Sequence, residues 1–234
     1  MNDSIFHNST LTTPAYVYDQ ERIVRVLENL SALQASTGCF PLYSIKSANL
    51  GGLLEMVKPY VSGFSCSSLF EARLATEVLQ NRNIHVTTPG YRAQEWDELV
   101  SLAGFITLNS VTQWQQFAAR ISKDSSCGIR INPELSFVAD KRYDPCRPGS
   151  KLGITFDQLA RTGNALDWSV IDGIHIHNNC ESRNFSELCR SVEHVMSRLV
   201  EYKPRLKWVN LGGGYLFGEH LNTEPLATLI QWLQ

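Results

Sequence analysis

Short apolar stretches alternate with longer amphipathic stretches along most of the chain. The apolar stretches are bounded by turn-forming residues, which predicts strands at residues 41–47, 63–68, 84–89, 105–110, 127–133, 173–178 and 208–214. Apolar residues recur with helical spacing elsewhere, which predicts helices at residues 20–36, 50–60, 69–81, 92–102, 111–122, 155–166, 184–201 and 222–234. This alternation predicts an α/β fold with a parallel sheet, and its commonest closed form is the TIM-type (β/α)8 barrel.

The number of predicted strands is one short of such a barrel. The pattern yields seven strands, and the sequence ends within the helix predicted after the seventh. We therefore expect an incomplete barrel that leaves two strand edges without a partner. In this interpretation residues 1–12 are an N-terminal arm, and residues 13–234 are a barrel domain truncated before its eighth strand.

Basic side chains lie on one face of three predicted strands. Because side chains alternate along a strand, these residues lie opposite the apolar residues of their own strands. They are Lys46, Arg130, His175 and His177. In a barrel the apolar face packs against the helices, and the other face points inward toward an active site at the carboxyl ends of the strands. An antiparallel sheet with its polar face in water is the alternative, and the intervening helices argue against it.

Lys46 alone permits two interpretations. A lysine on a mostly buried strand is unfavourable unless it is paired or has a chemical role. A lysine that has reached the end of a strand simply points into solvent. The stretch 41–49 favours neither interpretation, so the decision depends on the residues that lie near Lys46 in the fold.

Composition restricts the classes of partner. The chain has 234 residues, 43% of them hydrophobic, and a net charge of −2, which gives no basic surplus for nucleic acid or an anionic membrane. No apolar run is long enough to cross a bilayer, and residues 1–13 lack the apolar core of a signal peptide. The six cysteines form no CxxC pair, which favours a thiol-reducing, cytoplasmic location.

A run of three glycines follows the apolar pair Trp208-Val209. Its members are Gly212, Gly213 and Gly214, within the sequence Asn-Leu-Gly-Gly-Gly-Tyr. Glycines at the end of a strand let backbone N–H groups approach an anion closely, and phosphate is the usual anion there. The alternative is a flexible turn, and the run matches neither the Walker A nor the GxGxxG pattern.

A lysine, a glycine turn and an inward histidine together indicate pyridoxal 5′-phosphate. Its aldehyde requires an amine, which Lys46 offers, and its phosphate requires backbone donors. His177 offers a flat surface for the pyridine ring, and Arg130 offers a positive charge in the same space. A metal held by His175 and His177 is the alternative, but no third ligand is evident in the sequence.

Six stretches in a fixed order extend this interpretation to most of the chain. They are residues 13–19 (TPAYVYD), 43–49 (YSIKSAN), 63–71 (GFSCSSLFE), 128–133 (GIRINP), 175–181 (HIHNNCE) and 210–215 (NLGGGY). Together they resemble the alanine-racemase-fold, group IV pyridoxal-phosphate-dependent decarboxylases. Within that group they most resemble the carboxynorspermidine/carboxyspermidine decarboxylases. The substrate part of this resemblance depends on residues 65–71 and 177–182.

The resemblance implies a role for each site residue and an activity. Lys46 would be the Schiff-base lysine, His177 would stack on the cofactor ring, and Arg130 would lie near the cofactor. The phosphate would rest on Gly212, Gly213 and Gly214. The implied reaction is decarboxylation of carboxynorspermidine or carboxyspermidine to norspermidine or spermidine, in a homodimer. The alternatives are an inactive pyridoxal-phosphate-binding or regulatory remnant of the family, and a single-domain barrel of the kind that serves pyridoxal phosphate homeostasis.

The sequence also departs from the family pattern. The family's Glu-Pro-Gly motif, which supplies a carboxylate to the pyridine nitrogen, is absent, and Glu224-Pro225 is followed by Leu226. We therefore assign no such role to Glu224. We also expect the chain to lack the C-terminal β-domain of the family. The polar loop 140–153 has two interpretations, a lid over a polyamine or a solvated surface loop.

Overall fold

The strands form one parallel sheet that curls into an open barrel. The computed structural model describes residues 12–162, 165–216 and 223–233. In this part of the chain the strands are β1 (Leu42–Ser44), β2 (Gly63–Cys66), β3 (Ile84–Thr87), β4 (Phe105–Leu108), β5 (Ser126–Ile131), β6 (Gly173–Ile176) and β7 (Trp208–Asn210). Each strand pairs in parallel with the next, in the order β1-β2-β3-β4-β5-β6-β7. This confirms the predicted parallel sheet of seven strands.

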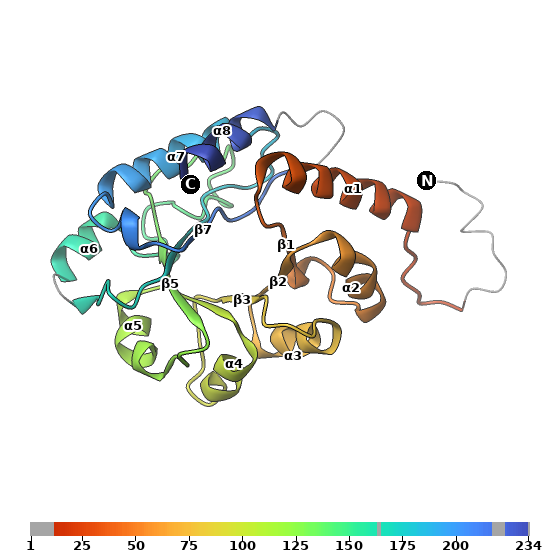
Figure 1. Cartoon of the computed structure of the whole chain (residues 1–234), viewed down its shortest axis with the longest axis horizontal. Helices are drawn as coiled ribbons and strands as arrows, with labels where there is room; N and C mark the ends of the chain where they lie inside the picture. Colours follow the sequence, from red (N-terminus) through yellow and green to blue (C-terminus); the bar gives the residue numbers. More distant parts are fainter. Residues whose placement is uncertain (1–11, 163–164, 217–222, 234) are drawn as a thin grey trace.

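The helices cover the convex side of the sheet (Figure 1). They are α1 (Gln20–Thr37), α2 (Gly51–Val57), α3 (Leu69–Val78), α4 (Trp96–Leu102), α5 (Val111–Phe117), α6 (Phe156–Thr162), α7 (Ser186–Arg198) and α8 (Glu224–Leu233). The sheet stays open between its first and last strands, and α1 and α8 contact each other beside this opening. None of the helices in the described ranges is long and apolar enough to cross a membrane.

Capping boxes explain why three of these helices begin where they do. A hydroxyl of Ser68, Ser110 or Thr155 accepts the backbone N–H three residues later. The acidic or amide side chain at that later position accepts a backbone N–H in return, as Gln158 does from Thr155 at 3.0 Å. Since these contacts satisfy N–H groups that have no partner within a helix, the S/T-x-x-E/Q pattern places each start locally.

The two faces of the sheet differ as the side-chain alternation predicts. Residues that face the helices are fully buried, for example Ile106, Ile129 and Ile174, each at 0% exposure. The inward face carries polar and aromatic side chains in register, and Arg130 on β5 lies opposite His175 on β6. Burial of the aliphatic face between sheet and helices supplies most of the driving force for folding.

An aromatic layer closes the amino-terminal end of the barrel. The Trp208 ring lies over two glycines, and a Cβ atom on Gly173 or Gly128 would come within 2.1 Å or 2.3 Å of it. Trp208 also contacts the Phe105 ring edge to face at 6.0 Å. Phe105 in turn stacks on His85 with ring centroids 4.0 Å apart. This layer leaves the carboxyl ends of the strands as the accessible end of the barrel.

Several strands are shorter than predicted, and the difference matters at Lys46. The first strand ends at Ser44, and residues Ile45–Ser47 form a 3-10 turn, η2. The Ser47 hydroxyl donates to Ser44 O at 2.7 Å, and the Tyr43 hydroxyl donates to Ala48 O at 3.2 Å. Such local side-chain bonds compete with strand pairing, so the placement of Lys46 within a strand was wrong.

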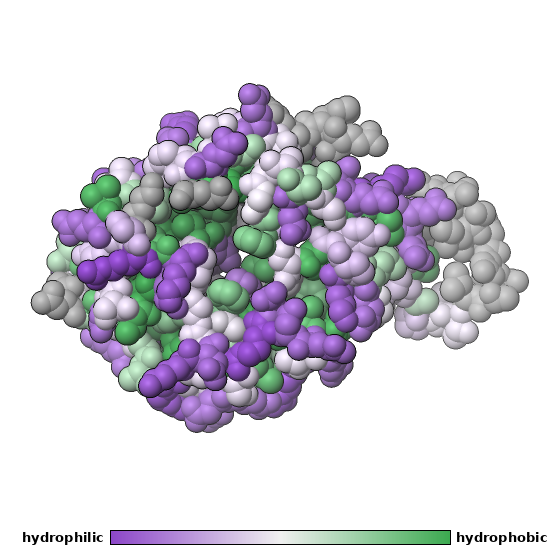
Figure 2. All heavy atoms as spheres, in the orientation of Figure 1, coloured by the Kyte–Doolittle hydropathy of each residue, from purple (hydrophilic) through white to green (hydrophobic). Residues whose placement is uncertain are grey.

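Figure 2 shows the same face of the molecule as Figure 1, with side chains coloured by hydropathy. Hydrophilic and hydrophobic residues are interspersed across it. Hydropathy on this face therefore does not single out a site, and the candidate site is identified by the side chains at the carboxyl ends of the strands.

Candidate functional site

Lys46 lies at the carboxyl end of the barrel beside the opening. It follows β1 directly, and its side chain is exposed because β1 pairs with β2 only, so that no described strand covers its other side. The sequence predicted a partly desolvated lysine on a strand, whereas the structure places an accessible amine on a turn. The positive charge of Lys46 nevertheless acts on His175 and His177, which places the three residues in one region.

Arg130 is a buried cation that points into the barrel. Its side chain is 7% exposed, and one guanidinium nitrogen, Nη2, donates to His177 O at 3.2 Å. No carboxylate lies within ion-pair distance of Arg130 in the described ranges. Burial lowers the pKa of Arg130, although a guanidinium stays charged at neutral pH. A buried charge without a counter-ion is unfavourable, so this site is built to receive an anion.

His177 is held as a neutral ring with a defined proton position. The backbone N–H of Gly213 donates to His177 Nδ1 at 3.2 Å. Burial, with the charges of Arg130 and Lys46, lowers the pKa of His177 to about 4. Because Nδ1 accepts a hydrogen bond, the neutral ring carries its proton on Nε2. The sequence placed this histidine correctly at the carboxyl end of β6.

The three glycines form a turn immediately after β7, where two of them need the left-handed backbone region. Gly212 has φ +71° and Gly214 has φ +92°. A Cβ atom on Gly212 would lie 2.5 Å from Ile176 O, whereas a Cβ atom on Gly213 would meet nothing within 4 Å. The turn therefore packs tightly against the end of β6 at Gly212 and borders open space at Gly213.

The N–H groups of the turn are not equally available to a ligand. Gly212 N donates to Asn210 Oδ1 at 2.9 Å, and Gly213 N donates to His177. The N–H of Gly214 has no acceptor among the described residues. An anion on this turn would bind the free donor at Gly214 or replace one of the two internal acceptors.

Two hydrogen bonds from Asn179 and Ser182, here called the clasp, hold this turn against the segment after β6, and sequence reasoning missed them. Asn179 Nδ2 donates to Gly214 O at 3.0 Å, and Ser182 N donates to the same oxygen at 2.8 Å. Asn178, which lies between His177 and Asn179 in the sequence, donates instead to Leu135 O and to Ser191 Oγ. The tandem asparagines after an inward histidine were a signal, because buried amides at a strand end usually bind backbone.

Two further histidines line the barrel interior below His177. His175 is 7% exposed, and its Nδ1 has no hydrogen-bond partner among the described residues. Burial and the charges of Arg130 and His177 hold the pKa of His175 well below its usual range. Burial lowers the pKa of His85, which stacks on Phe105, to about 4. The barrel interior therefore contains neutral imidazole rings, with the cations Lys46 and Arg130 toward the carboxyl ends of the strands.

The loop between β5 and α6 is anchored at both ends. Asn132 N donates to Ile154 O at 2.9 Å, and Ile154 N donates to Arg130 O at 2.8 Å. Asn109 binds the returning strand of the loop at Lys151 O and Gly153 N. Charged residues of the loop 140–153 differ in their surroundings. Asp144 and Arg147 line a cavity of about 490 Å³, whereas the Arg142 side chain is 80% exposed and pairs with Asp140. The role of this loop as a lid stays a prediction.

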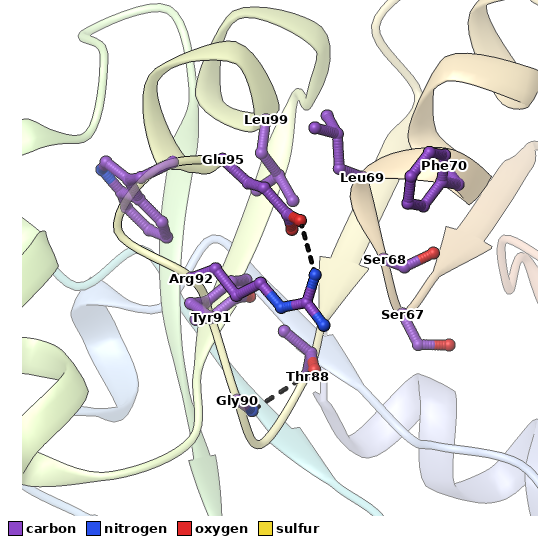
Figure 3. A pocket seen from close by; sticks show the side chains of 11 residues that line it. Ser67, Ser68, Leu69, Phe70, Thr88, Gly90, Tyr91, Arg92, Glu95 and Leu99 are labelled. Atoms are coloured by element: carbon purple, nitrogen blue, oxygen red, sulfur yellow. Dashed lines mark hydrogen bonds and ion pairs between the residues drawn. The ribbon is translucent and has the colours of Figure 1, made fainter.

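A smaller pocket of about 220 Å³ lies between the segments that follow β2 and β3 (Figure 3). Arg92 extends across it and pairs with Glu95 at 3.0 Å, while Gly90 N donates to Thr88 Oγ1 at 3.3 Å. The lining residues include none of the site residues that the sequence predicted. This pocket is therefore separate from the cluster around Lys46 and Arg130.

The buried histidines give the protein a pH dependence. Their imidazoles take up protons near pH 6.5 in the unfolded chain, but only near pH 4 in the folded chain for His85 and His177. The unfolded state thus binds more protons between these values, so the free energy of unfolding should fall as pH decreases from about 6.5 to about 4. Each of the two contributes up to about 3 kcal/mol to this loss.

Urea unfolding at several pH values measures this effect. Replacing His85 by phenylalanine retains the stacking on Phe105 but removes the imidazole. The free energy of unfolding should then depend less steeply on pH. If the free energy of unfolding of this variant depended on pH as steeply as that of the wild-type chain, the lowered pKa of His85 would be contradicted. A variant at His194, which lies outside the barrel interior on α7, serves as the control.

Comparison with known proteins identifies the family of this chain. A model of the family "Pyridoxal-dependent decarboxylase, pyridoxal binding domain" matches residues 21–232. A carboxyaminopropylagmatine decarboxylase from Synechocystis is 35% identical over 209 residues, which are 89% of this chain and 52% of the relative. A carboxynorspermidine/carboxyspermidine decarboxylase from Campylobacter jejuni is 31% identical and matches 88% of this chain and 52% of the relative. The chain thus spans about half the length of the curated relatives it matches.

Solved structures show the same barrel. The crystal structure of carboxynorspermidine decarboxylase complexed with norspermidine, from Campylobacter jejuni, superposes with a TM-score of 0.81 at 27% identity, over 94% of this chain and 56% of that one. A diaminopimelate decarboxylase from Helicobacter pylori shares the fold at a TM-score of 0.77 and 19% identity, over 99% of this chain and 62% of that one. By the family match over most of its length, this chain belongs to the pyridoxal-dependent decarboxylases and contains their pyridoxal-binding domain.

Proposed function

We propose that Lys46, Arg130, His177 and the turn Gly212–Gly214 bind pyridoxal phosphate. The observation that carries this proposal is the Arg130 guanidinium, which is 7% exposed and has no carboxylate partner in the described part of the chain. The site contains two cations and neutral histidines, a charge balance that fits an anionic cofactor. The open space beside Gly213 fits a phosphate group.

Each residue has a task that follows from its surroundings. The exposed amine of Lys46 is accessible to an aldehyde and would hold the cofactor covalently. The Arg130 charge would balance the negative charge of cofactor or substrate. A neutral His177 ring would lie against a cationic pyridine ring without charge repulsion, which an imidazolium could not do. When bound, the cofactor supplies an electron-withdrawing ring that accepts the electron pair left when CO₂ departs.

We further propose that the substrate is a carboxylated polyamine. The support is that the relatives at 35% and 31% identity are named for carboxyaminopropylagmatine and for carboxynorspermidine/carboxyspermidine. The product would be norspermidine, spermidine or the corresponding agmatine derivative. Asp144 and Arg147 in the cavity beside β5 offer charges of both signs, which suits a substrate carrying a carboxylate and several ammonium groups. Residues 13–234 would act as the barrel domain of a homodimeric cytoplasmic enzyme.

The alternative is a pyridoxal-phosphate-binding chain without decarboxylase activity. The sequence provides no Glu-Pro-Gly motif, and Glu224 is the first residue of α8, in the helical layer outside the sheet. Without a carboxylate on the pyridine nitrogen the electron sink is weaker. This alternative therefore predicts cofactor binding without turnover.

Release of CO₂ from defined substrates distinguishes an active decarboxylase from a chain that only binds the cofactor. Carboxynorspermidine, carboxyspermidine and carboxyaminopropylagmatine are compared with diaminopimelate, the substrate class of the relatives near 24% identity. We expect CO₂ release from a carboxylated polyamine and none from diaminopimelate. Cofactor absorbance without CO₂ release from any of them would favour the inactive alternative, and a preference for diaminopimelate would contradict the substrate proposal.

A further inference from the structure

We infer that Asn179 is a positioning residue that fixes the glycine turn in the shape that accepts a phosphate group. The inference rests on the proposed function, because it concerns how the same turn receives the phosphate of pyridoxal phosphate. It concerns a residue that needs no contact with the cofactor itself. Its basis is the clasp between the segment after β6 and the turn after β7.

The contact is buried and specific. Asn179 is 9% exposed, and its Nδ2 donates to Gly214 O at 3.0 Å. Ser182 N donates to the same oxygen at 2.8 Å, and Leu216 N donates back to Ser182 O at 2.9 Å. A Cβ atom on Gly214 would lie 2.8 Å from Asn179 O, so the two segments touch backbone to backbone. One carbonyl oxygen is thus held by two donors at a point of close approach.

Holding that oxygen sets the direction of the next N–H. In a trans peptide the C=O and N–H groups point in opposite directions. Since Gly214 O points toward Asn179 and Ser182, the N–H of Tyr215 points away from the segment after β6. Neither this N–H nor that of Gly214 has an acceptor among the described residues. Two consecutive backbone donors of this turn are therefore free to bind an anion.

The side chain matters because glycine leaves the turn easily reorganised. Glycine adopts positive and negative φ about equally well, so a peptide flanked by glycine rotates at little cost. The Ser182 bond alone leaves one donor on Gly214 O, and the Asn179 amide adds a second from a side chain anchored in the protein interior. Loss of this amide should lower the fraction of molecules whose donors face the ligand, which weakens binding of the phosphate.

Neighbouring residues provide matched controls. Asn178 is also buried but binds Leu135 O and Ser191 Oγ, so its loss should affect stability and leave the turn unchanged. The Tyr215 hydroxyl lies near the Asn179 side chain, and Tyr215→Phe removes that hydroxyl alone. Asn179→Asp keeps the size of the side chain but replaces the donor with an oxygen that repels Gly214 O.

The test compares the affinity of each variant for pyridoxal 5′-phosphate and for pyridoxal, measured by absorbance titration. Pyridoxal offers the same aldehyde and ring without the phosphate, so the ratio of the two dissociation constants reports the groups that bind the phosphate, and its change in an Asn179 variant reports the turn. We expect Asn179→Asp to reduce the preference for the phosphorylated form about tenfold, and Asn179→Ala about fivefold. Asn178→Ala and Tyr215→Phe should leave the preference unchanged.

The outcomes separate the two proposals. A wild-type chain that binds pyridoxal and its phosphate equally would contradict the phosphate site of the proposed function. A wild-type preference that persists in both Asn179 variants would contradict this inference alone. If Asn179→Asp does not fold, the milder Asn179→Ala decides, because the Ser182 bond remains in place to hold the turn. An equal loss in Asn178→Ala would show that the effect is merely structural and would overturn the assignment.

Discussion

Replacing Lys46 by alanine is expected to abolish covalent capture of pyridoxal phosphate. Lys46 follows β1 at the carboxyl end of the barrel, and its charge acts on both His175 and His177. Among the described residues, no other lysine carries a charge that affects these two histidines. The variant should show no visible absorbance from protein-bound pyridoxal and no cofactor mass after borohydride reduction, whereas the wild-type chain shows both.

Lys58→Ala is the matched control for this experiment. Lys58 also lies in a short 3-10 turn, Lys58–Tyr60, in the same connection between β1 and β2. Its side chain is 38% exposed and lies 3.9 Å from Glu55. This variant should retain the absorbance and the trapped mass. Trapped cofactor at a wild-type level in Lys46→Ala would reject Lys46 as the anchor, and peptide mapping would then identify the lysine that replaces it.

Alanine at Gly212 and alanine at the adjacent Gly213 should have different effects, the first on stability and the second on cofactor affinity. Gly212 has φ +71°, and an added Cβ would lie 2.5 Å from Ile176 O and 3.0 Å from His177 Cα. Gly212→Ala should therefore lower the free energy of unfolding by about 2 kcal/mol or more. Gly213→Ala meets open space and should fold normally, but its methyl group would occupy the region proposed for the phosphate. We expect its affinity for pyridoxal phosphate to fall about tenfold.

Thermal unfolding and cofactor titration measure the two effects separately. Gly149 provides a control, because its φ is also positive, at +75°, but no atom lies within 4 Å of an added Cβ. Gly149→Ala should show the strain of a positive φ without the clash and without any loss of cofactor affinity. If Gly213→Ala binds the cofactor as tightly as the wild-type chain, the phosphate does not occupy the space beside that glycine.

Arg130 shows what strand periodicity alone can establish. Alternation along β5 places it opposite Ile129 and Ile131, and the structure confirms that it points inward next to His175. The reason is general: a parallel sheet covered by helices buries its aliphatic face, so the opposite face must line the barrel. Periodicity could not show that this guanidinium lacks a carboxylate partner, because partners come from other strands.

Lys46 shows where the same reasoning fails. An apolar run around it predicted a strand through residue 47, but the hydroxyls of Ser47 and Tyr43 close a 3-10 turn there instead. A turn of three residues depends on individual side-chain bonds that no periodicity records. The exposure of Lys46 also depends on the unpaired edge of β1, which is a property of the sheet.

The sequence by itself determined the alternation of seven strands with helices, the inward face of the barrel and the residues that belong to its carboxyl end. These follow from local periodicity and from glycine, which act over a few residues. Only the tertiary structure decided how these residues meet: the Gly213 bond to His177, the clasp of Asn179 on Gly214, and the Trp208 ring over Gly173. Each of these contacts joins segments more than 30 residues apart. Such contacts exist only once the sheet has brought neighbouring strands into register.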